Sequence, residues 1–303
     1  MNWFPAAILT ALATATGDTI LKARFSHLSP GSMAIVKSTA PMPFLLPLLL
    51  VISWPETDLV FWQTVGFLVP FEILALLLYM QALRVSPLSL SIPFLAFTPV
   101  FIVLTGWLVL DEKVTIAGLL GILCIVTGAY VLHIKGSRKG LFEPIKAIAK
   151  EQGSRLMLAV AGIYGLTSVL GKKAIQHSDP IFFACFYFML LGIVTPLSLG
   201  ALSWITNGFG SQNKQSTLWS FKKTGRNPWG AWWAIGLAQT IMVLSHMWAI
   251  HLVTAAYMIA VKRTSLIFSV IYGKLIFKEK EITQRLAGAS LMVLGVGLIV
   301  LAG

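Results

Sequence analysis

Long apolar runs separated by short polar stretches make up almost the whole chain. Hydrocarbon offers no hydrogen-bond partner to a free backbone group, so an apolar run of roughly 20 residues is typical of a helix that crosses a bilayer. The strict alternation of apolar and polar residues that marks a membrane strand is absent. We predict an all-α membrane protein with ten transmembrane helices, at residues 4–22, 31–53, 59–83, 87–110, 114–134, 155–175, 180–203, 229–250, 252–274 and 283–302.

The chain also contains an internal repeat. A shift of 167 residues places Gly121 on Gly288 and superposes the fourth and fifth predicted helices on the ninth and tenth. A shift of 150 residues places Lys22 on Lys172, at the ends of the first and sixth helices. Because the first apolar run has a counterpart in the middle of the chain, we read it as a structural helix and not as a cleaved signal.

Five helices per repeat is an odd number, so the second copy must enter the membrane from the side opposite to the first. The sequence therefore predicts two inverted five-helix repeats, residues 1–134 and 155–303, joined by a basic linker at 135–154. Inverted repeats are typical of alternating-access carriers, whose binding site lies near the midplane between the two halves.

Composition supports lipid as the main solvent, since 57% of the residues are hydrophobic and 11% are charged. The formal net charge of +12 could suggest a nucleic-acid partner. The basic residues lie in short loops between apolar runs, however, which favours contact with anionic lipid head groups and argues against nucleic acid. Cys124 and Cys185 both lie inside apolar runs, so no disulfide framework, metal motif or cofactor is expected.

Lys and Arg are distributed unevenly between the two ends of the predicted helices. The odd-numbered loops hold 17 of the 23 basic residues, the opposite face holds 3, and the other 3 lie within helices. Cytoplasmic loops are enriched in these residues. The count predicts a multi-pass protein of the cell inner (plasma) membrane with both termini outside.

Two segments carry a resemblance to a known family. Residues 98–132 and 265–301 each read as a helix, an acidic turn and a Gly-rich helix, and the stretch Gly17-x-Thr19-x-x-Lys22 adds a second signature. The chain resembles EamA-type proteins of the drug/metabolite transporter superfamily over essentially its whole length. This resemblance implies a transporter fold of two repeats, with both termini more commonly in the cytoplasm than outside.

Local features resemble two other branches of the superfamily. The segment Val261-Lys262-Arg263-Thr264 is similar to the Lys-Arg pair with which triose-phosphate translocators hold phosphate. The first helix resembles that of small multidrug-resistance transporters, but Thr14 stands where those proteins have their membrane glutamate. Their cation-antiport mechanism is therefore not implied here, and Asp18, one turn later, is the candidate replacement for proton coupling.

Glu72 lies near the centre of the third predicted helix, and the repeat places Gln239 at the equivalent point of the eighth. A carboxylate at the bilayer centre costs roughly 2.5–3.5 kcal/mol on insertion scales, so it should face the protein interior. Two readings are equally favoured: Glu72 couples proton movement to transport, or it is buried and paired with a basic neighbour.

Lys262 and Arg263 lie near the middle of the ninth predicted helix. Guanidinium and ammonium groups together suit a phosphate or carboxylate, so we favour substrate binding over an internal ion pair with Glu72 or Asp18. Adjacent residues on a helix diverge by about 100°, so both can face one site only if the helix is unwound there.

Other polar residues within the apolar runs are weaker candidates. His246 and its repeat equivalent Tyr79 are candidate substrate-binding residues, although a lone membrane histidine is more often a packing residue. Lys37, near the start of the second helix, is expected to extend toward the surface. Glu112, ahead of the fifth helix, is expected to stabilise the N-terminus of that helix.

No HExxH, GxSxG, P-loop or metal-ligand spacing occurs in the sequence, which disfavours a membrane enzyme. A purely structural subunit would not need central charges. We expect a secondary active transporter that moves a small organic metabolite, anionic or zwitterionic, by alternating access. The alternative is a flippase or exporter of lipid-linked or drug molecules with the same fold. The bilayer and a small-molecule substrate are the expected partners, and a homodimer is left open.

Overall fold

The computed structural model describes residues 3–85, 92–133, 152–207, 228–277 and 283–302, and helix is the only regular secondary structure in these ranges. Within them, six helical segments are long and apolar enough to cross a membrane. The other predicted spans correspond to shorter or interrupted helices. Most of the predicted linker at 135–154 lies outside the described ranges, and its last three residues already belong to a helix.

The first half of the described chain consists of α1 (Trp3–Phe25), α2 (Pro30–Thr39), α3 (Met42–Val51), α4 (Leu59–Val85), η1 (Ile92–Phe97), α6 (Thr98–Leu110) and α7 (Ile116–His133). The span predicted at 31–53 is therefore divided in two. Pro41 stands at the start of α3 and Pro43 in its first turn. Because proline has no backbone N–H, an interruption there costs few hydrogen bonds.

The second half consists of α9 (Gln152–Gln176), α10 (Pro180–Asn207), α11 (Pro228–Leu252), α12 (Ala255–Lys262), α13 (Ser265–Phe277) and α14 (Thr283–Ala302). Its helix boundaries follow the repeat that the sequence indicated. Shifting Thr98, the first residue of α6, by 167 gives Ser265, the first residue of α13. The continuous helix expected at 252–274 is wrong, because a turn at Arg263 and Thr264 interrupts it. In the helix expected at 87–110, the 3₁₀ helix η1 changes to α6 at the equivalent point, Thr98.

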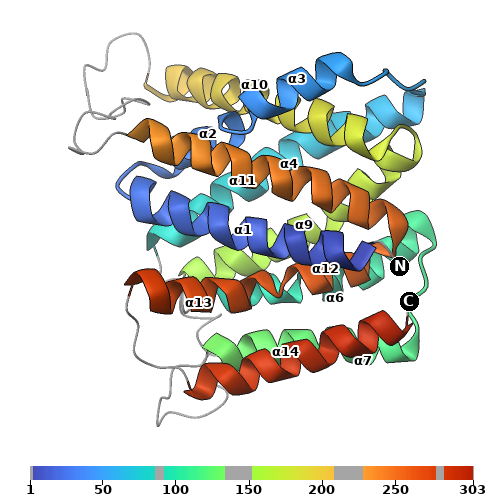
Figure 1. Cartoon of the computed structure of the whole chain (residues 1–303). Coiled ribbons are helices and arrows are strands. Elements are labelled where there is room, and N and C mark those ends of the chain that lie inside the picture. The colour runs from blue at the N-terminus through green and yellow to red at the C-terminus, as the bar shows by residue number, and fades with distance from the viewer. Residues whose placement is uncertain (1–2, 86–91, 134–151, 208–227, 278–282, 303) are drawn as a thin grey trace.

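Packing between the helices follows the same relation. α1 packs along α11, and α4 packs along α9. These two contacts are equivalent, because the repeat relates α1 to α9 and α4 to α11. In the third pair, α7 packs along α14. Figure 1 shows these helices running across the bundle in roughly one direction, with the N- and C-terminal ends of the chain at the same end of it. Each of these three pairs therefore combines one helix from each half.

Glycines allow α7 and α14 to approach closely. A Cβ atom added to Gly121 would lie 2.7 Å from the carbonyl oxygen of Gly295, and one added to Gly128 would lie 2.6 Å from that of Gly288. Gly288 and Gly295 are the residues that the 167-residue shift assigns to Gly121 and Gly128. The two contacts are thus equivalent, and each needs a residue without a side chain.

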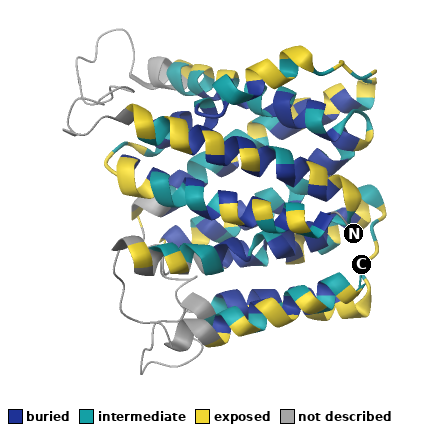
Figure 2. Ribbon diagram, in the orientation of Figure 1, coloured by how far each residue is buried: buried dark blue, intermediate teal, exposed yellow. Residues whose placement is uncertain are grey.

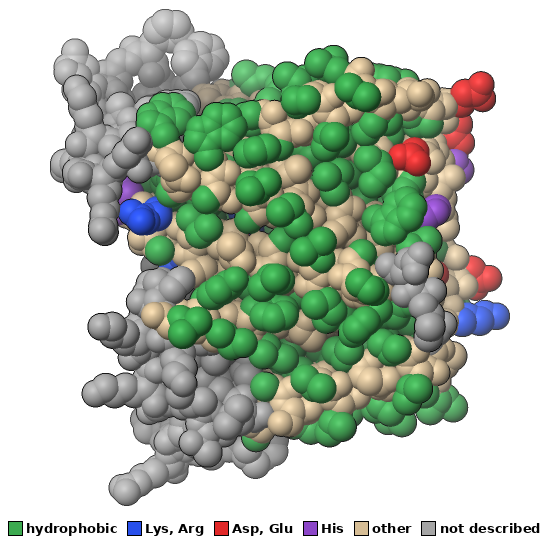
Figure 3. All heavy atoms as spheres, viewed as in Figure 1, with side chains coloured by type: hydrophobic (Ala, Val, Ile, Leu, Met, Phe, Trp, Pro, Cys, Tyr) green, Lys and Arg blue, Asp and Glu red, His purple; other side chains and the backbone are tan. Residues whose placement is uncertain are grey.

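The outside of the bundle is apolar between its two ends. Exposed residues lie on the outer faces of the helices (Figure 2). On the face shown in Figure 3 most side chains are hydrophobic, and the charged ones gather at the two ends. Leu104 and Trp107 of α6, for example, are 57% and 55% exposed. Such a surface suits contact with lipid chains.

One of the charged ends carries a link between the two halves. Asp58, just before α4, accepts a hydrogen bond from the backbone N–H of Phe61 at 2.9 Å and lies 2.7 Å from Nδ1 of His177, beyond α9. The Phe61 N–H is the main cause that holds the pKa of the Asp58 carboxyl below its usual range, and His177 adds to it.

Candidate functional site

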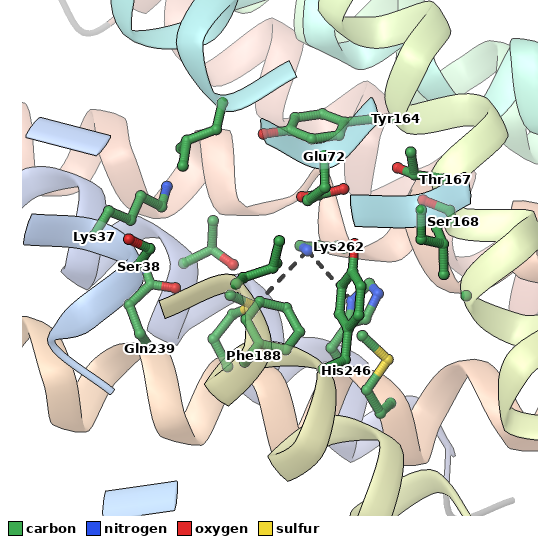
Figure 4. A pocket seen from close by; sticks show the side chains of 18 of the residues that line it. Lys37, Ser38, Glu72, Tyr164, Thr167, Ser168, Phe188, Gln239, His246 and Lys262 are labelled. Atoms are coloured by element: carbon green, nitrogen blue, oxygen red, sulfur yellow. Dashed lines mark hydrogen bonds between the residues drawn. The ribbon is translucent and has the colours of Figure 1, made fainter. Parts of the chain in front are cut away.

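A cavity of about 190 Å³ lies among α1, α2, α4, α9, α10, α11 and α12. Its wall includes every residue that the sequence suggested for substrate binding or proton coupling: Asp18, Glu72, Tyr79, Gln239, His246, Lys262 and Arg263. Figure 4 shows side chains from several helices pointing into this space, with Lys262 near its centre. Residues far apart in the sequence are therefore gathered around one interior space.

The helix interruption between α12 and α13 brings Lys262 and Arg263 to the same cavity. Lys262 is the last residue of α12, Arg263 and Thr264 form a turn, and α13 begins at Ser265. On a continuous helix two adjacent side chains would diverge by about 100°. The turn removes that restriction, and both side chains line the cavity.

Lys262 has only neutral partners among the described residues. Its Nζ lies 3.3 Å from Nδ1 of His246 and 3.9 Å from the sulfur of Met242. Both contacts are weak for an ammonium group, which has three N–H donors. The internal ion pair with Glu72 or Asp18 that competed with substrate binding is not formed, since neither carboxylate lies within 4.0 Å of Lys262.

Arg263 joins the fourth and ninth spans. Its Nη2 donates a hydrogen bond of 2.7 Å to the hydroxyl of Thr98, the first residue of α6. Its Nε is buried and, within the described part of the chain, has no hydrogen-bond partner. The guanidinium thus holds the starts of α6 and α13 together and keeps one N–H donor unused beside the cavity.

Asp18 and Lys37 form an ion pair on the cavity wall. The Nζ of Lys37 lies 2.7 Å from Oδ1 of Asp18, and Tyr79 donates a longer hydrogen bond of 3.5 Å to Oδ2. The same ammonium lies 5.2 Å from the centre of the Tyr79 ring. The expectation that Lys37 extends to the membrane surface is wrong, because the carboxylate of Asp18 and the aromatic ring hold it at the cavity.

Glu72 of α4 faces the cavity opposite Lys262 (Figure 4). Thr167 of α9 also lines this cavity, and no Lys or Arg of the described residues lies within 4.0 Å of the Glu72 carboxylate. Gln239, its repeat equivalent, is 4% exposed and lies where α11 meets α1. The cavity therefore contains two carboxylates in different situations: Asp18 is paired and Glu72 is not.

A second ion pair closes one side of the cavity. Lys172 of α9, which also lines the wall, donates hydrogen bonds to Oε1 of Glu112 and to the carbonyl of Val253. The other oxygen of Glu112 accepts the backbone N–H of Ala255 at 2.9 Å. Ala255 is the first residue of α12, so Glu112 stabilises the N-terminus of α12 and not, as expected, that of the fifth span.

The sequence analysis missed several residues of the wall, and the repeat itself was the unused signal. The 150-residue shift assigns Ser168 to Asp18 and Tyr187 to Lys37, and all four line the cavity. Ser168 and Tyr187 are neutral and drew no notice in an apolar run. The equivalence also shows that the Asp18–Lys37 pair exists in one half of the chain only.

Comparison with known proteins gives a consistent picture. The model of a family described as "EamA-like transporter family" matches residues 1–134 and 152–301. Among 29 matching chains of solved structures, one titled "Crystal structure of protein" superposes with a TM-score of 0.67 at 14% identity, covering 99% of this chain and 96% of that one. At this identity the likeness concerns the fold alone. None of the curated proteins compared with the chain matches it.

Proposed function

Because the chain belongs to the EamA-like transporter family, we propose that it is a secondary carrier that moves a small organic metabolite, anionic or zwitterionic, across the bilayer by alternating access. The observation that carries this proposal is Lys262, an ammonium group that lines the cavity and whose only hydrogen-bond contacts among the described residues are His246 and Met242. A buried cation without a counter-ion is costly, and an anionic substrate would supply one.

The architecture we propose for this carrier is ten membrane spans in two inverted five-helix repeats, residues 1–134 and 155–303. The matching helix boundaries, the equivalent glycine contacts and the equivalent helix starts at Thr98 and Ser265 support it. The cavity lies between the halves, as expected where two inverted repeats rock against each other.

We further propose that the protein resides in the inner (plasma) membrane with both termini outside. The support is the distribution of basic residues, 17 on one face against 3 on the other. The N- and C-termini lie at the same end of the helix bundle, as expected for a chain that crosses the membrane an even number of times (Figure 1).

Proton coupling is assigned to Glu72, with Asp18 as the second candidate. Glu72 has no cation within 4.0 Å among the described residues, so no ion pair has to break before it can exchange a proton. Asp18, in contrast, is paired with Lys37 at 2.7 Å. A carboxyl group that meets water on either side in turn could carry a proton with each cycle.

Binding of anions to the purified chain tests the substrate proposal. Losing one hydrogen bond to a charged group costs about 1.5–3 kcal/mol, so Lys262→Gln should weaken binding of a carboxylate or phosphate metabolite roughly 10- to 150-fold. Lys113→Gln, an exposed lysine away from the cavity, is the matched control. If Lys262→Gln keeps full affinity and only lowers the melting temperature, the lysine is structural and the proposal fails.

The remaining competitor is a flippase for lipid-linked or drug molecules. Liposomes that contain the purified protein separate the two activities, because a metabolite carrier takes up a water-soluble anion and leaves the lipids where they are. Lipid scrambling without uptake of any soluble anion would favour the flippase.

A further inference from the structure

The wall of the cavity carries six charged side chains, and their charges do not cancel. The six are Asp18, Lys37, Glu72, Lys172, Lys262 and Arg263. Lys172 has a counter-ion of its own in Glu112. Of the other five, three are cations and two are carboxylates, so the empty cavity carries a net charge of +1 when all of them are ionised.

In a cavity that solvent screens poorly, the charge of the ligand should neutralise the net positive charge of the wall. The attraction between unit charges grows as the effective dielectric constant falls, and an uncompensated charge is costly to bury. A ligand with one negative charge makes the occupied cavity neutral. A ligand with two negative charges leaves an excess of one and binds with a penalty.

Asp18 is the side chain that fixes this number. Without it the count would be three cations against Glu72 alone, a net charge of +2. The Asp18 carboxylate also lies 2.7 Å from the ammonium group of Lys37. It is thus the counter-ion of a lysine that lines the cavity and could otherwise bind the ligand. Two of the three N–H donors of Lys37 have no hydrogen-bond acceptor among the described residues.

The fold itself does not need this ion pair. The repeat assigns Ser168 and Tyr187 to Asp18 and Lys37, and these neutral residues occupy the equivalent places in the other half, also on the cavity wall. The helices around them pack in the equivalent way, α9 on α4 as α1 on α11. A pair present in one half only points to the ligand and not to packing.

We propose that Asp18 is a specificity-determining residue: by holding Lys37 it limits the cavity to substrates with a single negative charge, and its removal opens the cavity to dianions. The inference rests on the proposed function, because it assumes that the cavity binds anions. It concerns a different property, the charge of the substrate, and a different residue from Lys262.

Two pairs of small anions of similar size test it, with binding to the purified full-length chain measured by calorimetry at slightly alkaline pH. The monoanions are monomethyl succinate and dimethyl phosphate, and the matching dianions are succinate and methyl phosphate. The wild type should prefer the monoanion of each pair. Asp18→Asn should shift the affinity ratio toward the dianion by roughly 15- to 100-fold, the effect of one unit charge at about 6–10 Å with an effective dielectric constant of about 20.

Two further variants control for charge and for folding. The double variant Asp18→Asn, Lys37→Gln removes both members of the ion pair and restores the net charge of the cavity to +1. It should therefore prefer monoanions again. Asp111→Asn removes a carboxylate that is exposed outside the cavity and should behave like the wild type; asparagine tolerates the left-handed conformation, with φ of 52°, at this position.

The outcomes separate this inference from the proposed function. If the wild type binds these anions but prefers dianions, or if Asp18→Asn leaves the ratio unchanged, the inference is overturned while anion transport stands. The preference of the wild type is measured without any variant, so the inference can be overturned even if Asp18→Asn does not fold. If the wild type binds none of the four anions, the anionic substrate fails, and the inference fails with it.

Discussion

Glu112 is the residue whose removal should destabilise the fold most specifically. Its carboxylate bridges Lys172 of α9 and the backbone N–H of Ala255 at the start of α12. Lys172 in turn donates to the carbonyl of Val253, at the junction of α11 and α12. These contacts connect the turn after α6, in the first half, to α9, α11 and α12 in the second half. Glu112→Ala removes both contacts and leaves an ammonium group and an N–H without these partners.

The loss can be estimated from the burial of the pair. The side chains of Lys172 and Glu112 are 10% and 12% exposed, so solvent screens their interaction little. Breaking a buried pair by removing one member typically costs about 3–5 kcal/mol, because the other charge stays buried. At about 2 °C per kcal/mol, near the lower end for larger domains, the melting temperature should fall by about 6–10 °C.

A thiol-reactive dye can report this unfolding without an added probe. Cys185 is fully buried in α10 and becomes reactive when the bundle opens, whereas the partly exposed Cys124 should first be replaced by alanine. Glu56→Ala, at an exposed position before α4, is the matched control and should leave the melting temperature unchanged.

A double variant completes the test. Glu112→Ala combined with Lys172→Met removes both charges, so it should melt closer to the wild type than Glu112→Ala alone does. The reasoning is refuted if Glu112→Ala melts within 2 °C of the control (about 1 kcal/mol), or if the double variant loses the full sum of the two single losses.

Three further predictions concern topology, packing and coupling. In a cysteine-free background, a membrane-impermeant maleimide should label Ser53→Cys but not Ser26→Cys in intact cells, and the reverse pattern would invert the proposed orientation. Gly128→Ala should destabilise the α7–α14 contact by about 1–3 kcal/mol, because its Cβ would lie 2.6 Å from a carbonyl oxygen, whereas Gly297→Ala, with open space around it, should not. Glu72→Gln should abolish the pH dependence of transport in proteoliposomes, and an unchanged pH profile would exclude Glu72 as the proton carrier.

Much of the fold could be read from the sequence because hydrophobicity and the repeat carry it. The run predicted at 59–83 corresponds to α4 at Leu59–Val85, and the run at 180–203 to α10, which starts at Pro180. The breaks in the second and ninth spans and the change of helix type in the fourth were not predictable from hydropathy, since each lies inside a longer run that is mostly apolar. Pro41 and Pro99 permit a break but do not require one.

The position of Lys37 illustrates why the site was harder to read than the fold. On an isolated helix near a membrane surface, a lysine gains most by extending toward water, which is what the sequence analysis expected. Its actual partner, Asp18, is 19 residues earlier on another helix, so the pair exists only once α1 and α2 are packed together.

Equivalence between the halves would have been the better guide to the cavity. Residues of the wall occur in pairs under the two shifts, as Glu72 with Gln239 and Asp18 with Ser168, and in each of these pairs one member is charged and the other neutral. A search for charged residues finds one member and misses the other. Because packing is shared by both halves while charge is not, the differences within such pairs indicate which side chains serve the ligand, and Asp18 is the one whose effect on ligand charge can be measured directly.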